Sequence, residues 1–185
     1  HQFTTGKVPC CVDARGADPV PEHDSPGELL FAIAEWWRHD HDRAGLLELW
    51  PHVERTVAYM DRLRASERTP ANRGTALYGL MPASISHEGY SAKPMHSYWD
   101  DFWALRGYAD AVALANVLGK HDEAARWATS RDEFRADLRA SILAAVHTHN
   151  IDYLPGAAEL GDFDATSTTI ALSPGDAQDW LPPAL

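Results

Sequence analysis

Basic residues are scarce in this sequence. Sixteen lysines and arginines stand against 27 aspartates and glutamates, which gives a formal net charge of −11 at pH 7. Nucleic acids and anionic membrane surfaces need clustered positive charge in their partners, so we predict neither as a partner. Uninterrupted apolar runs are also short, and none approaches the roughly 20 residues of a membrane-spanning helix. An integral membrane protein is therefore not expected.

Cysteine is nearly absent, with only Cys10 and Cys11 in 185 residues. Two cysteines cannot build a disulfide framework, and we expect ordinary thiols here rather than a vicinal disulfide or metal ligands. The ten histidines form no His-x-x-x-His or Glu-x-x-His pair with an obvious third ligand on a predicted helix. A Gly-rich phosphate loop, a Gly-x-Ser-x-Gly elbow and a Cys/His nucleophile pair are also missing. We predict no metal and no other cofactor, and cysteine usage leaves the cellular compartment open.

Helical periodicity dominates what is present. Ser25-Pro26-Gly27-Glu28 predicts a helix start, with Ser25 as N-cap, Pro26 at the first helical position and Glu28 closing a capping box. Pro51 is expected to bend or divide the second helix. Alternating strand patterns are lacking, so the predicted class is all-α. The predicted order is a loop at 1–24, a helical hairpin at 25–66, a loop at 67–96, a second hairpin at 97–148, a loop at 149–163 and the start of a third hairpin at 164–185.

A weak internal repeat runs through these hairpins. Each unit begins at an acidic residue, namely Asp24, Asp100 or Asp101, and Asp164. The turns 41–44 and 121–124 both read His-Asp-x-Ala. Repeated helical hairpins predict a solenoid or a closed ring, because one hairpin cannot bury its own apolar face. The turns within hairpins are short and the links between them are long, so any site is predicted on the rim that carries the long links.

The densest group of chemistry-bearing residues is Tyr98-Trp99-Asp100-Asp101-Phe102-Trp103, at the predicted start of the third helix. Glycoside hydrolysis needs a protonated carboxylic acid beside the leaving oxygen and a second carboxylate that activates water or attacks. Neighbouring aromatic rings desolvate a carboxyl group and raise its pKa toward that working range. The structural alternative is that the acids cap the helix while the tryptophans fill the core.

Three further stretches place polar and aromatic residues in the long links. Glu22-His23-Asp24 precedes the first helix, Ser86-His87-Glu88-Gly89-Tyr90 lies between hairpins together with Lys93 and His96, and Gly161-Asp162-Phe163-Asp164 precedes the last helix. Each has a structural interpretation as a helix cap or a solvated loop. The third occurrence of an acid before a helix favours a shared rim site.

Parts of this sequence resemble bacterial proteins of the six-hairpin glycosidase superfamily. The similarity lies in Val20–Leu30, in the Ile85–Tyr90 loop and in Tyr98–Gly107, while the hairpin pattern covers nearly the whole chain. That superfamily has an (α/α)6 toroid and includes glucoamylases, debranching glucosidases, trehalases and α-L-rhamnosidases. The resemblance implies part of such a toroid and a domain that hydrolyses a glycosidic bond, usually with inversion.

The resemblance also implies roles for particular residues. In glucoamylase-like members the general acid follows a Trp at a helix start, which matches Asp100 here, with Asp101 second; those relatives carry Glu at this position. The general base is then Asp164 or Glu88, or lies outside the chain. The expected substrate-binding residues are Glu22, His23, Asp24, His87, Tyr90, Lys93, His96, Tyr98, Trp99, Trp103, Arg106 and Asp162.

Two hairpins and part of a third make about half of a six-hairpin ring. We therefore expect an oligosaccharide, polysaccharide or glycoside as substrate, and association with a second copy or with the remainder of the toroid. Two alternatives stay open. One is a non-catalytic carbohydrate-binding or helical interaction scaffold, and the other is a sugar epimerase, isomerase or polysaccharide lyase that uses the histidines and tyrosines of the rim.

Overall fold

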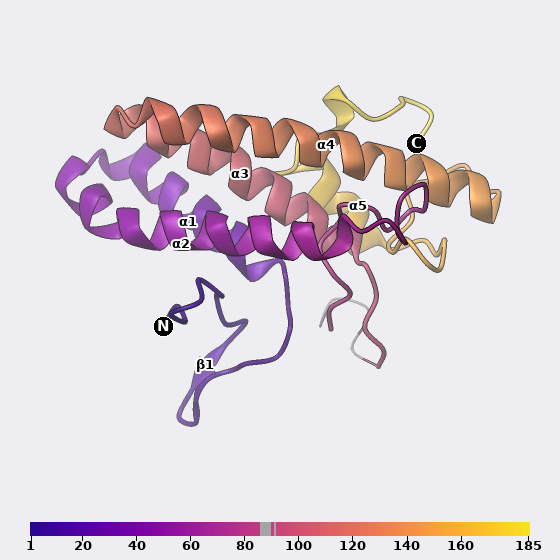
Figure 1. Ribbon diagram of the computed structural model, residues 1–185, viewed down its shortest axis with the longest axis horizontal. Coiled ribbons are helices and arrows are strands. Elements are labelled where there is room, and N and C mark those ends of the chain that lie inside the picture. The colour runs from indigo at the N-terminus through magenta and orange to yellow at the C-terminus, as the bar shows by residue number, and fades with distance from the viewer. Residues whose placement is uncertain (86–89, 91) are drawn as a thin grey trace.

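Helices make up most of the chain in the computed structural model, which describes residues 1–85, 90 and 92–185 (Figure 1). Within these residues the helices are α1 (Ser25–Asp40), α2 (Arg43–Glu67), α3 (Tyr98–Leu118), α4 (His121–His149), α5 (Ala165–Leu172) and the 3-10 turn η1 (Ala177–Asp179). The prediction of an all-α protein is confirmed. No helix in this part of the chain is both long and apolar enough to cross a bilayer.

The helix starts differ in detail from the predicted ones. Asp24, not Ser25, is the N-cap of α1, and its carboxylate accepts a hydrogen bond from the Ser25 backbone N–H at 2.6 Å. Asp164 caps α5 in the same way, by accepting from the backbone N–H groups of Thr166 and Ser167. Ser97 is the N-cap of α3. Asp100 and Asp101 therefore lie inside the first turn of α3 and are not its capping residues, which corrects the proposed equivalence of the three acidic starts.

The two short turns also differ. His41 ends α1 in the left-handed conformation and Asp42 caps α2, whereas Gly119 ends α3 and Asp122 already belongs to α4. The two similar His-Asp-x-Ala stretches therefore occupy different positions relative to the ends of their helices. Helix α2 runs undivided through Pro51, contrary to the predicted division. The reason is that Leu47, whose carbonyl loses its helical donor to the proline, lies on the exposed side of α2.

A small sheet was not predicted. In the N-terminal segment, β1 (Val12–Asp13) pairs antiparallel with β2 (Gly16–Ala17) around a tight turn. Gly16 makes this turn with φ of 110°, a value that side-chain-bearing residues rarely adopt. The segment extends away from the helical body in Figure 1. Its bonds to that body include the amide of Gln2 donating to Thr56 Oγ1 of α2 at 2.8 Å.

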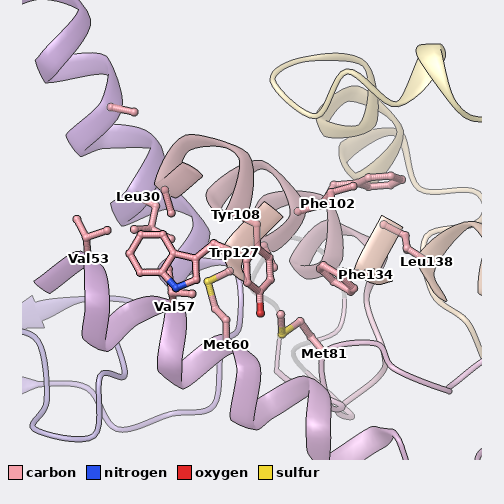
Figure 2. Packing of buried hydrophobic residues seen from close by; sticks show 14 of the residues in the cluster. Leu30, Val53, Val57, Met60, Met81, Phe102, Tyr108, Trp127, Phe134 and Leu138 are labelled. Atoms are coloured by element: carbon pink, nitrogen blue, oxygen red, sulfur yellow. The ribbon is translucent and has the colours of Figure 1, made fainter. Parts of the chain in front are cut away.

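Helix α3 lies at the centre of the fold, because it packs against α1, α2, α4 and α5. The long return helices α2 and α4 cover one side of it, and the core lies between these elements. Figure 2 shows Val53, Val57 and Met60 of α2 directed into this cluster, which also contains Trp127 of α4. Helices α1, α3 and α5 thus form one row, and their starting ends meet at the same end of the fold.

Candidate functional site

The predicted rim forms where α1, α3 and α5 begin. The indole N–H of Trp99 in α3 donates to the Oδ2 atom of Asp24, the cap of α1, at 2.8 Å. On the other side, the Tyr98 N–H donates to the Gly156 carbonyl at 3.0 Å. Gly156 lies so close to the Asp164 side chain that an added Cβ would meet the Asp164 Cβ at 2.5 Å. Asp24 and Asp164 are thus connected to the first turn of α3 through its residues Trp99 and Tyr98.

Asp100 is enclosed at the centre of this rim, with only 1% of its surface exposed. The Ser84 hydroxyl donates to its Oδ2 atom. Burial raises the pKa of Asp100 well above 3.8, the nearby charges of Asp24 and Asp101 raise it further, and the Ser84 bond opposes the shift. The net effect shifts Asp100 toward the neutral acid.

Asp101 is bonded to a different residue, Met81 in the loop that precedes α3. Its Oδ1 atom accepts from the Met81 N–H at 2.8 Å, and its Oδ2 atom has no hydrogen-bond partner among the described residues. Burial raises the pKa of Asp101 to about 7, although the Met81 N–H and the cationic forms of His96 and Arg64 act in the opposite direction. Asp101 thus titrates close to neutrality.

His96 connects the rim to the loop before α5. Its Nδ1 atom lies 2.6 Å from Oε1 of Glu159, and its Nε2 atom lies 3.6 Å from a Glu67 carboxylate oxygen. Burial lowers the pKa of His96, but the hydrogen bond and the charge of Glu159, followed by Asp101 and Glu67, outweigh it and leave the pKa raised. For Glu159, burial raises the pKa and His96 lowers it by more, so the net pKa is below 4.5. Both shifts favour the charged forms of the pair, a protonated imidazole beside a carboxylate.

The other predicted loop residues occupy varied positions. Tyr90 donates from its hydroxyl to Asp162 Oδ2 at 2.9 Å, and burial raises its pKa. His23 is buried, and burial together with Lys7 and His96 lowers its pKa to about 4, so its ring is neutral near pH 7. Glu22 is likewise buried, and Lys93 is exposed. His87 and Glu88 lie outside the described residues.

Tyr98 and Arg106 lie away from any surface that a ligand at the rim would touch. Tyr98 is fully buried and shares a hydrogen bond of 2.8 Å with Ser141 of α4. Arg106 lies two turns further along α3, where it donates to Asp110 and to the Pro174 carbonyl. Both positions favour structural roles over the predicted contact with substrate.

A partly exposed aromatic row descends from the rim along α1 and α3. The Trp99 and Trp103 ring centroids lie 6.1 Å apart, and Trp103 lies 5.5 Å from Phe31 of α1. Trp99 and Trp103 were predicted, whereas Phe31 was missed because its spacing is that of an ordinary helix residue. Ser84 and Glu159 were missed because no motif marks a loop residue whose partner is distant in sequence.

The titration of Asp101 predicts how stability depends on pH. Its pKa is about 7 in the folded chain and about 3.9 in an unfolded one. Between these values the folded chain binds a proton that the unfolded chain has lost, so the free energy of unfolding falls as pH rises. Replacing Asp101 by Asn keeps the oxygen that accepts from Met81 and removes the titration. We expect the slope between about pH 4 and 7 to weaken by up to about 1.4 kcal/mol per pH unit.

Chemical denaturation at a series of pH values measures this slope. The control is Asp132→Asn on α4, because that carboxyl group is half-exposed and Arg131 lowers its pKa. The stability that the Asp132 carboxylate adds is lost only as pH falls through its lowered pKa, below the range in question. Parallel profiles for the natural chain and Asp101→Asn would contradict the placement of Asp101.

Chemically, this arrangement combines two enclosed carboxyl groups with raised pKa values, a capping carboxylate and partly exposed indole rings. Proton donation and stacking against an apolar ligand face are the chemistry that it offers. Neither the family models nor the curated proteins compared with the chain give a match.

Proposed function

We propose that this chain is part of a glycoside hydrolase domain, in which Asp100 is the general acid. The observation that carries the proposal is the enclosed Asp100 carboxyl group, whose pKa burial raises and which directly follows Trp99 of the aromatic row in the chain. A general acid must be protonated at the working pH in order to donate to the leaving oxygen. Asp101 is the second candidate for this role, since its pKa is also raised.

Residues around Asp100 have the chemistry required for binding the sugar and for activating water. Asp24 is ready to accept hydrogen bonds from sugar hydroxyls, and the indole rings of Trp99 and Trp103 offer faces for a pyranose ring. Asp164 is the general base candidate within the described residues, Glu88 being the other candidate in the chain. With Asp164 or Glu88 activating water on the opposite face of the sugar, the bond would be cleaved with inversion.

The row of α1, α3 and α5, with α2 and α4 as return helices, supports the proposal of a partial (α/α)6 toroid. In such a ring the inner helices start at one rim, and their long connecting loops surround the substrate. Completion by a second copy or by further hairpins would cover the side of the row that carries Trp103 and Phe31. The solution mass of the chain tests the first of these possibilities.

Turnover of a panel of aryl glycosides tests the function, and Asp100→Asn tests the residue. We expect the variant to lose at least about 100-fold in kcat/KM while still binding sugar, because general acid catalysis contributes at least that much. Asp110→Asn is the control: Asp110 is equally buried but lies in the middle of α3, away from its start, and is paired with Arg38 and Arg106. Activity that survives in Asp100→Asn but not in Asp110→Asn would overturn the assignment.

The closed environment of Asp100 and Asp101 favours a second candidate, a non-catalytic carbohydrate-binding scaffold. Both carboxyl groups are almost fully buried and accept hydrogen bonds from Ser84 and Met81. In a scaffold they would hold the loop against α3, and sugars would contact only the outer residues of the rim. Sugar binding without turnover by any substrate in the panel, at any oligomeric state, would select this candidate.

A further inference from the structure

The N-terminal hairpin brings together two thiols and two carboxyl groups. The pairing of Val12 with Ala17 continues to the next residues, because the Asp18 N–H donates to the Cys11 carbonyl at 3.0 Å. Residues directly opposite in an antiparallel pair have neighbouring side chains. The backbone therefore places the Cys11 side chain against that of Asp18, and Cys10 adds a second thiol at the point where the strand begins.

The spacing of these groups is that of a tetrahedral metal site. The Sγ atoms of Cys10 and Cys11 lie 3.4 Å apart, and Cys11 Sγ lies 3.8 Å from Asp18 Oδ2. Zinc binds sulfur at about 2.3 Å and carboxylate oxygen at about 2.0–2.2 Å. A regular tetrahedron with these bonds has ligand-to-ligand edges of roughly 3.5–3.8 Å. All three ligand atoms lie within 4.8 Å of one another, so one ion could contact them after a local movement of the chain.

Neighbouring groups act on this cluster, and one bond orients a ligand in it. The Glu22 carboxylate interacts with the Cys10 thiol from beside the three atoms. The other oxygen of Asp18 accepts from the Val20 N–H at 2.9 Å, which leaves Oδ2 turned toward Cys11. Such outer bonds fix the direction of a metal ligand. The Lys7 ammonium interacts with Cys10, Asp18 and Glu22 and offsets part of their negative charge.

We propose that Cys10, Cys11 and Asp18 bind one zinc-class divalent ion, beside the Glu22 carboxylate. This revises the expectation of ordinary thiols, which rested on the number of cysteines and could not include the position of Asp18. The ion would join the start of the hairpin to Asp18 on its second side and so fix the shape of the N-terminal segment. Binding displaces thiol protons.

Titration of the reduced chain with Co²⁺, followed by displacement with Zn²⁺, tests the site without any assay of activity. We expect one equivalent of Co²⁺ to give a thiolate-to-cobalt charge-transfer band and the intense visible bands of tetrahedral cobalt. Cys10→Ser or Cys11→Ser should weaken binding at least about 100-fold, beyond the 10–100-fold typical of an outer partner. Asp18→Asn should weaken it at least about 10-fold.

Asp13→Asn is the matched control, since Asp13 lies in the same hairpin but is paired with Arg15. It should leave the cobalt spectrum and the affinity unchanged. Absence of the charge-transfer band would overturn the proposal, as would equal weakening by Asp13→Asn and Asp18→Asn, which indicates binding by general negative charge. Circular dichroism of each variant identifies a loss of fold. The outcome is independent of glycoside turnover.

Discussion

Replacing Arg64 by Met is expected to lower the free energy of unfolding by about 3–5 kcal/mol, the range for one partner of a buried ion pair. Arg64 is 4% exposed and belongs to α2. Its guanidinium donates to the Gly79 carbonyl at 3.3 Å, to the Ser130 carbonyl at 3.0 Å and to Asp137 at 3.1 Å. It also lies 4.5 Å from the Phe134 ring centroid. Methionine fills the space of the aliphatic stem but removes the donor to the two carbonyls and leaves Asp137 with Arg68 as its remaining cationic partner.

The matched control is Arg68→Met, one turn further along the same helix. Arg68 pairs with the same Asp137 and with Glu133, but its side chain is 32% exposed. Exposed pairs contribute about 0–1 kcal/mol, so this variant should change stability little. Chemical denaturation of both variants at one pH gives the comparison. Equal losses would mean that the shared ion pair matters and that the enclosed position of Arg64 does not.

Arg64 also affects the pKa of Asp101 at the rim through its positive charge. Its charge is one of the influences that lower the pKa of Asp101, so its removal should raise that pKa above about 7. The pH range over which Asp101 affects stability would then extend upward. Denaturation of Arg64→Met at the series of pH values used for Asp101→Asn would measure this effect on the candidate site.

The sequence pattern was sufficient to predict the helices but not their caps. Apolar spacing and the Ser25-Pro26 signal located α1, because a helix face and a proline act through near neighbours in the chain. Whether Asp24 or Ser25 supplies the cap depends on one backbone conformation, and local patterns favour both equally. The pairing of β1 with β2 was missed because two-residue strands are too short to show an alternating pattern.

The candidate site was predictable only in part for a related reason. Asp24, Asp100 and Asp164 were recognisable as acids near helix starts, which is a local property. The bonds from Ser84 to Asp100 and from Glu159 to His96 join residues from different loops. Their meeting depends on how α1, α3 and α5 are arranged in space, and no residue type or spacing reports this. Sequence thus indicated which ends of the helices carry the acidic residues, while the structure shows which of their carboxyl groups are buried.

Replacing Gly27 by Ala should be strongly destabilising, although Gly→Ala in a helix normally stabilises by about 1 kcal/mol. A Cβ at Gly27 of α1 would meet the Trp103 carbonyl oxygen of α3 at 2.1 Å and its carbon at 2.4 Å. A Cβ at Gly107 would in turn meet the Gly27 Cα at 2.8 Å. These obstacles are backbone atoms, so rotating a side chain cannot relieve them. We expect a loss of about 3 kcal/mol or more, at the upper end for overpacking.

Gly45→Ala provides the contrast that isolates this effect. There the added Cβ would meet side-chain atoms, Asp42 Oδ2 at 2.7 Å and the Trp36 ring at 2.8 Å, which can rotate aside at a smaller cost. Comparison of the two unfolding free energies therefore reports whether α1 and α3 touch through their backbones. If Gly27→Ala behaves as an ordinary helical substitution and stabilises the chain, the two helices do not meet at this point. The Trp99–Asp24 bond, and with it the convergence of carboxyl groups at the rim, would then lose its geometric basis.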